Sequence, residues 1–145
     1  MVHDNLNEGI SVLGEIDHIG IAVQSLKSYH SLYGDLLGGA YLGQETVIDE
    51  DVRIAMYRFG VHSKVELLEP LGTDGAIAKH VRDRGEGIHH IAFTVEDIES
   101  SLKIAQASGY RPIPGYPKTG AHNCRVAFLH PKTTGKTLIE LVQHQ

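Results

Sequence analysis

The sequence is poor in the features that mark disulfide-stabilised, membrane-bound or nucleic-acid-binding proteins. It contains one cysteine, Cys124, so no disulfide can form within the chain, and we expect a reducing compartment such as the cytoplasm. Lysine and arginine number 13 against 18 aspartates and glutamates, and no basic run occurs, which argues against a nucleic-acid partner. No stretch approaches the ~20 consecutive apolar residues of a transmembrane helix. Residues 1–15 lack the basic start and apolar core of a signal peptide, so we interpret them as a soluble leader and expect no membrane partner.

The remaining composition is ordinary for a globular protein. Of the 145 residues, 41% are hydrophobic and 21% are charged, which is enough apolar material for one sizeable core. Neither a low-complexity tract nor a long linker divides the chain. We therefore expect a single domain over residues 1–145.

The chain contains two copies of one module, and each copy carries a histidine and then a glutamate. Residues 16–23 (Ile-Asp-His-Ile-Gly-Ile-Ala-Val) return as residues 88–95 (Ile-His-His-Ile-Ala-Phe-Thr-Val), so that His90 repeats His18 at a shift of 72 (90 − 18). Residues 65–68 (Val-Glu-Leu-Leu) return as residues 139–142 (Ile-Glu-Leu-Val), so that Glu140 repeats Glu66 at a shift of 74 (140 − 66). The repeat predicts modules at about 14–72 and 86–144, joined by a short helix at about 75–85.

Hydrophobic periodicity predicts the order β-α-β-β-β in each module. Leu26, Tyr29, Tyr33 and Leu36 recur at helical spacing after a cap at Gln24 or Ser25, and Asp97 is expected to cap the corresponding second helix. We predict the following strands and helix: strands 16–23, 40–48, 52–59 and 64–68 in the first module, strands 88–95, 110–113, 125–130 and 137–142 in the second, and the joining helix 76–84.

The four repeated side chains are placed to bind a metal. Alternation along a strand puts each of them on the face opposite its bulky apolar neighbours, and small residues such as Gly20 share the face of the first histidine. If the modules pair about a pseudo-twofold axis, His18, Glu66, His90 and Glu140 can converge. Two imidazoles and two carboxylates form a plausible shell for a divalent ion with open positions.

These motifs resemble the vicinal-oxygen-chelate superfamily, which contains glyoxalases, bleomycin-resistance proteins and dioxygenases. The resemblance covers about residues 16–143 and is most specific to the methylmalonyl-CoA epimerase family in residues 118–122 (Lys-Thr-Gly-Ala-His) and 128–132 (Phe-Leu-His-Pro-Lys). It implies an α+β fold in which two paired βαβββ modules form a half-open barrel around a metal. It further implies a homodimer with an acyl-CoA substrate, whose (R)- and (S)-methylmalonyl-CoA forms interconvert through a metal-stabilised enolate.

The resemblance also assigns roles to individual residues. It makes His18, Glu66, His90 and Glu140 the ligands of one divalent metal ion per subunit, with Co²⁺ favoured for activity and Zn²⁺, Ni²⁺ or Mn²⁺ as alternatives. Glu140 would also be one of two proton-transferring bases. His122 and Lys118 would contact the acyl-CoA.

The second base is ambiguous in the sequence. The family places it in a Pro-Glu-x-Gly segment, whereas residues 47–52 read Val-Ile-Asp-Glu-Asp-Val and have neither the proline nor the glycine. An ungapped match selects Asp49, and keeping the glutamate selects Glu50, which we choose; a solvated acidic turn is the competing interpretation.

Two other functions compete with the epimerase. Glyoxalase I has a similar four-ligand shell and moves a proton between neighbouring carbons of a glutathione hemithioacetal. A non-catalytic drug-binding protein of the same superfamily is the second alternative, and the four intact ligand positions count against it.

Overall fold

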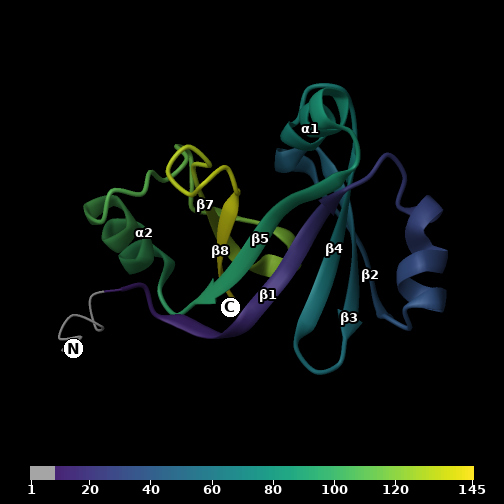
Figure 1. The fold of residues 1–145 in the computed structure, drawn as a ribbon, viewed down its shortest axis with the longest axis horizontal. Coiled ribbons are helices and arrows are strands. Elements are labelled where there is room, and N and C mark those ends of the chain that lie inside the picture. Colours follow the sequence, from purple (N-terminus) through teal and green to yellow (C-terminus); the bar gives the residue numbers. More distant parts are fainter. Residues whose placement is uncertain (1–8) are drawn as a thin grey trace. The chain divides into compact units, whose positions relative to one another are not determined.

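Eight strands and two α-helices occur among residues 9–145, the part of the chain that the computed structural model describes (Figure 1). In chain order they are β1 (Val12–Ala22), β2 (Ala40–Val47), β3 (Val52–Phe59), β4 (Ser63–Pro70), α1 (Ala76–Arg84), β5 (Gly87–Val95), α2 (Ile98–Ala107), β6 (Lys118–Thr119), β7 (Arg125–Leu129) and β8 (Ile139–Gln143). Much of the predicted leader lies outside the described residues, and its last four residues belong to β1 instead. None of the helices in residues 9–145 has the length and apolar character needed to cross a bilayer.

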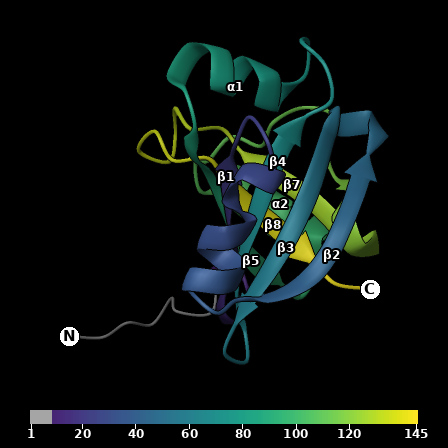
Figure 2. The ribbon, with the colours of Figure 1, turned by 90° about the vertical axis from the view of Figure 1, so that its right-hand side faces the viewer.

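The chain divides into two compact units, and residues 15–92 form the first of them. Its strands follow the order β2-β3-β4-β1-β5, with β4 antiparallel to β3 and parallel to β1 (Figures 1 and 2). The parallel register places Gly20 of β1 opposite Glu66 of β4. Strands β2, β3 and β4 and helix α1 occupy nearly the residues predicted for them, so the periodicity argument is confirmed for these elements.

The predicted first helix is helical but not an α-helix. Lys27–Tyr29 forms a 3₁₀ turn and Ser31–Leu36 a π-helix, and no side chain caps the start, so the predicted cap at Gln24 or Ser25 is wrong. Gly34 weakens α-helix propensity in the middle of the segment. A π turn contains more residues than an α turn, which rotates later positions away from the core. Leu36, the last residue of the predicted helical spacing, is accordingly 77% exposed.

The inward face of this segment still packs as predicted. Leu26 is buried in a cluster with Val23 and Leu67, and Tyr29 and Tyr33 pack against that cluster. The Tyr29 hydroxyl donates a hydrogen bond to Glu86, which also accepts one from the Gln24 backbone N–H at 2.8 Å. The bond from Tyr29 holds the pKa of Glu86 below its ordinary value, and the same bond raises the pKa of Tyr29. The helical segment is thereby tied to the residue that precedes β5.

Among the described residues, the second unit consists of residues 93–145 together with residues 9–14. Within it, β8, β7 and β6 lie in that order, and α2 begins after Asp97 as predicted. The Asp97 carboxylate accepts hydrogen bonds from the backbone N–H groups of Glu99 (3.2 Å) and Ser100 (3.5 Å), which satisfies donors that a helix start otherwise leaves unpaired. Ile98 packs with Leu141 of β8 in the core of this unit.

The strand predicted for residues 110–113 is absent. This segment makes only an isolated bridge from Pro112 to Leu129, with hydrogen bonds from Ile113 N–H to the Phe128 carbonyl (2.8 Å) and from His130 N–H to the Arg111 carbonyl (2.7 Å). Proline lacks the N–H that a ladder needs, and prolines at positions 112, 114 and 117 therefore prevent continuous pairing.

Candidate metal centre

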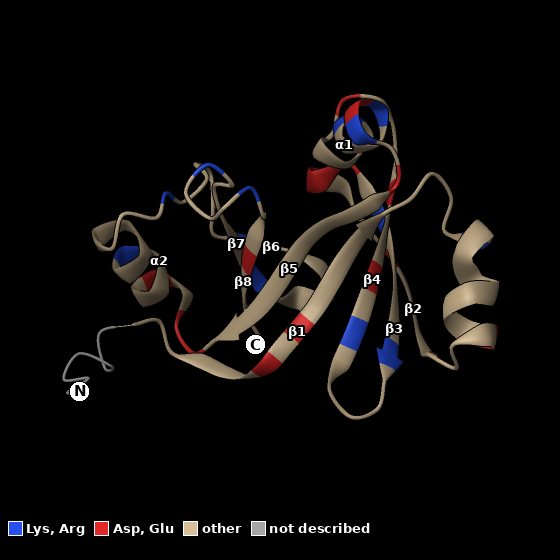
Figure 3. Ribbon diagram, in the orientation of Figure 1, with Lys and Arg blue, Asp and Glu red and all other residues tan. Residues whose placement is uncertain are grey.

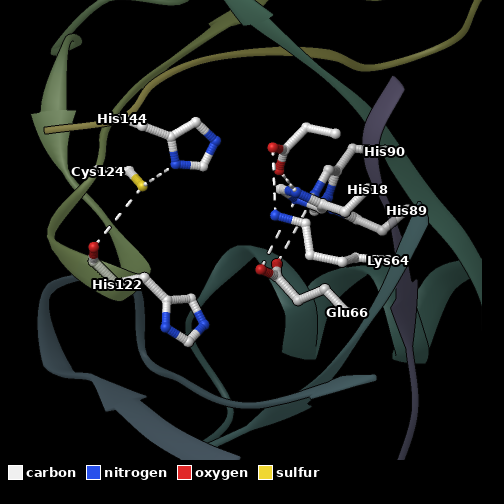
Figure 4. Close-up of polar contacts among 9 residues, drawn as sticks. His18, Lys64, Glu66, His89, His90, His122, Cys124 and His144 are labelled. Carbon is white, nitrogen blue, oxygen red and sulfur yellow. Dashed lines mark hydrogen bonds and ion pairs between the residues drawn. The ribbon is translucent and has the colours of Figure 1, made fainter. Parts of the chain in front are cut away.

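Three of the four predicted ligands come together within residues 15–92. His18 lies on β1, Glu66 on the neighbouring parallel strand β4, and His90 on β5 (Figure 4). All three are buried, with exposed fractions of 4%, 7% and 3%. Buried imidazole and carboxylate groups are costly without partners, so their joint burial points to a specific site.

The geometry of the three side chains fits a metal ion. The Nε2 atoms of His18 and His90 are 3.1 Å apart, and Glu66 places its Oε2 3.7 Å from the first and its Oε1 3.8 Å from the second. Two ligands at about 2.1 Å from one ion lie about 3.0 Å apart at an octahedral angle and about 3.4 Å apart at a tetrahedral angle. The nitrogen pair falls within this range, and the two carboxylate oxygens lie slightly beyond it. The donor set suits a divalent transition metal.

A glycine makes room for this arrangement. A Cβ built on Gly20 would lie 2.1 Å from Cε1 of His90, closer than real Cβ contacts come. Gly20, one of the small residues on the face of His18, therefore makes room for the second imidazole.

In both imidazole rings, the Nδ1 atom, which is not the nitrogen facing the other ligands, has a close partner. His18 Nδ1 is 2.6 Å from Asp17 Oδ2, and the other oxygen of Asp17 is 3.3 Å from Lys64 Nζ. His90 Nδ1 is 2.9 Å from His89 Nδ1. The sequence analysis assigned no role to Asp17 or Lys64; the position of Asp17 directly before a predicted ligand was the available signal.

Glu140, the fourth predicted ligand, belongs to the other unit. It lies on β8 opposite Phe128 of β7 and is 6% exposed. Its neighbour Leu141 is part of the apolar core, so the carboxylate is on the opposite face of the strand, as the alternation predicted.

The two candidates for the second base differ in burial. Residues Ile48–Glu50 form a 3₁₀ turn that ends at Asp51, which has a left-handed backbone (φ 51°). Glu50 is half-buried in this turn, whereas Asp49 is exposed.

The predicted substrate-binding residues lie on one short segment of residues 93–145. Lys118, on β6, holds its Nζ 4.9 Å from the centre of the Tyr116 ring, and His122 has a left-handed backbone (φ 55°). Both side chains are exposed. Beside them, the buried Cys124 thiol lies 3.2 Å from His144 Nδ1, a partner that the sequence did not reveal (Figure 4).

Comparison with known proteins agrees with the fold. A model of the Glyoxalase/Bleomycin resistance protein/Dioxygenase superfamily matches residues 17–128, and the chain belongs to this family. The glyoxalase-like α+β fold class predicted from the sequence is thus confirmed.

Individual relatives narrow the likeness to epimerases. The chain is 37% identical to the uncharacterized protein YqjC of Bacillus subtilis over 90% of this chain and 93% of that one. It is 35% identical to an ethylmalonyl-CoA/methylmalonyl-CoA epimerase of Cereibacter sphaeroides over 91% and 99% of the two chains. Among solved structures, Streptomyces coelicolor methylmalonyl-CoA epimerase in complex with 2-nitronate-propionyl-CoA is 33% identical, with a TM-score of 0.85 over 94% of this chain and 99% of that one. The predicted resemblance to this family of epimerases is confirmed.

Proposed function

We propose that this protein is a metal-dependent epimerase that interconverts (R)- and (S)-methylmalonyl-CoA. The observation that carries the proposal is the buried group of His18, Glu66 and His90, whose facing ligand atoms all lie within 4.8 Å of one another. The relatives of this chain that are named as epimerases indicate the class of reaction.

The proposed metal is held by His18, Glu66 and His90 together with Glu140, the partner of Glu66 in the sequence repeat. Bound there, a divalent ion would act as a Lewis acid toward the thioester carbonyl, an effect worth several kcal/mol. Two neutral imidazoles and two carboxylates balance the charge of such an ion, which favours burial of the site. We propose Co²⁺ as the active ion, with Zn²⁺, Ni²⁺ and Mn²⁺ as alternatives.

The proton chemistry is assigned to two carboxylates. The hydrogen on C2 of the substrate, between the thioester and carboxylate carbons, must be removed from one face and returned to the other. A base on each face of the planar enolate is sufficient for this exchange. We propose Glu140 as one base and Glu50 as the other; the partial burial of Glu50, in contrast to the exposed Asp49, supports that choice.

The substrate is proposed to be an acyl-CoA. A related epimerase has been solved with an acyl-CoA ligand, and Lys118 and His122 offer exposed cationic and hydrogen-bonding groups for such a molecule. A cytoplasmic homodimer completes the proposal, and sedimentation equilibrium of the purified protein tests the dimer.

Deuterium exchange at the substrate tests the proposed function directly. Co²⁺-loaded protein is incubated with one stereoisomer of methylmalonyl-CoA in D₂O, and NMR follows uptake at C2 alongside a chiral assay. We expect exchange coupled to inversion, and we expect loss of both after dialysis against a chelator and recovery on adding Co²⁺.

The same preparations distinguish the alternatives. Exchange no faster than in protein-free buffer would exclude the epimerase for this substrate. Turnover of a glutathione hemithioacetal would then support glyoxalase I, and ligand binding that is indifferent to metal removal would support a drug-binding protein.

A pair of matched substitutions identifies the second base. Glu50→Gln is expected to reduce inversion about 10²- to 10⁴-fold, because removing a general base typically has this effect, while Asp49→Asn stays near the wild-type rate. Metal affinity should be unchanged in both variants. The reverse pattern in the chiral assay would assign the base to Asp49, and full activity of both variants would leave the acidic turn with a solvated role only.

A further inference from the structure

The imidazole of His18 contacts, at Nδ1, the carboxylate of a partly buried ion pair between Asp17 and Lys64. Asp17 is 8% exposed, and its carboxylate places Oδ2 2.6 Å from His18 Nδ1 and Oδ1 3.3 Å from Lys64 Nζ. Lys64 comes from β4, the strand that also carries Glu66. Figure 4 shows Lys64 and Glu66 approaching the histidines from the same strand, and Figure 3 shows acidic residues on β1 and both signs of charge on β4.

The chemistry of the carboxylate decides which nitrogen of His18 carries the proton. An ionised carboxylate accepts hydrogen bonds and donates none, so a contact of 2.6 Å requires the proton to be on Nδ1. In a neutral imidazole the other nitrogen is then unprotonated and can act as an acceptor or a metal ligand. That nitrogen, Nε2, is the atom that faces His90 and Glu66.

The second histidine is held differently. His90 Nδ1 meets another imidazole, that of His89, at 2.9 Å, and His89 packs edge-on against His80 of α1. A neutral imidazole can donate from one nitrogen and accept at the other, so this contact fixes no tautomer by itself. The carboxylate of Asp17, by contrast, can only accept, so its contact with His18 does fix a tautomer.

We infer that Asp17, oriented by Lys64, is a positioning residue that locks His18 in the tautomer with the proton on Nδ1 and so presents Nε2 to a divalent cation. This inference rests on the proposed metal centre. Lys64 satisfies the second carboxylate oxygen and balances its charge, which keeps Asp17 turned toward the ring. Partners of this kind typically raise metal affinity about 10- to 100-fold.

Nitrogen NMR of the metal-free protein tests the tautomer without any metal. Two-bond ¹H–¹⁵N correlations of ¹⁵N-histidine-labelled protein are recorded above the ordinary imidazole pKa of about 6.5. The His18 signals, assigned by their loss in His18→Gln, are expected to show a protonated Nδ1 and an unprotonated Nε2. A proton on Nε2 in the wild type would overturn the inference.

Cobalt binding tests the consequence. Asp17→Asn keeps the shape of the side chain but allows its amide to donate to Nδ1, and we expect Co²⁺ affinity, measured by competition with a chromophoric chelator, to fall about 10- to 100-fold. The matched control is Asp83→Asn, which removes an aspartate paired with Lys79 at 2.9 Å on α1 and should bind Co²⁺ as the wild type does.

The outcomes separate the two proposals. Equal Co²⁺ affinity of Asp17→Asn and wild type, in metal-free samples with matching thermal unfolding, overturns the positioning role. If Asp17→Asn is unfolded, the His18 tautomer that NMR shows in the wild type decides whether the inference holds. Wild-type protein that binds no Co²⁺ overturns the proposed metal centre, and the NMR result still reports on Asp17.

Discussion

Replacing Glu140 by glutamine is expected to slow deuterium exchange at C2 of methylmalonyl-CoA by at least about 10²- to 10⁴-fold, since a general base is lost. The amide cannot accept a proton at neutral pH, but its carbonyl oxygen can still coordinate a metal. Metal affinity should therefore fall by less than the rate does. Exchange measured at saturating Co²⁺ separates the loss of the base from the loss of a ligand.

The same substitution at Glu69 is the matched control. Glu69 lies on β4, three residues after Glu66, and pairs with Arg53 at 3.5 Å. Glu69→Gln should retain both exchange and metal binding. If Glu140→Gln exchanges the C2 proton as fast as Glu69→Gln, Glu140 is not a base in this reaction.

Gly20→Ala should damage the metal centre without changing any ligand. The new Cβ would lie 2.1 Å from the buried ring of His90, so the imidazole must leave its present position beside His18 and Glu66. We expect the Co²⁺ affinity to drop at least about tenfold and the free energy of unfolding to fall by about 1–3 kcal/mol, as overpacking of a core usually does. Chelator competition and denaturant unfolding measure the two effects.

Gly72→Ala provides the comparison for this experiment. A Cβ on Gly72 would meet nothing within 4 Å, and its backbone does not have the positive φ that favours glycine. The free energy of unfolding of Gly72→Ala should remain within about 0.5 kcal/mol of the wild-type value. Wild-type Co²⁺ affinity in Gly20→Ala would show that His90 can shift and still bind, or that it is not a ligand.

The sequence predicted those features that depend on periodicity. Alternation placed Glu66 opposite the apolar residues Val65 and Leu67, and Leu67 is fully buried in the core. Asp97 was recognisable as a cap because its side chain acts on backbone groups only two and three residues away. In both cases the information is contained in a few neighbouring residues.

Features that depend on the backbone or on distant residues were not predictable in the same way. The π-helix at Ser31–Leu36 preserves helical spacing over one turn and then shifts it, which the pattern of apolar residues does not reveal. The bond between Lys64 and Asp17 joins residues 47 positions apart and follows from the parallel pairing of β1 with β4. Neither the pairing nor its register was part of the sequence prediction.

The contact between Gly20 and His90 means that the two halves of the repeat are not interchangeable. At the shift of 72 that relates His18 to His90, the counterpart of Gly20 is Ala92. A symmetric protein assembled from two copies of the second module would carry alanine at position 20, and its methyl group would occupy the space of the imidazole. A single methyl group is therefore enough to make the two modules of such a repeat unequal. The first module must keep glycine at position 20, whereas the second carries alanine at position 92.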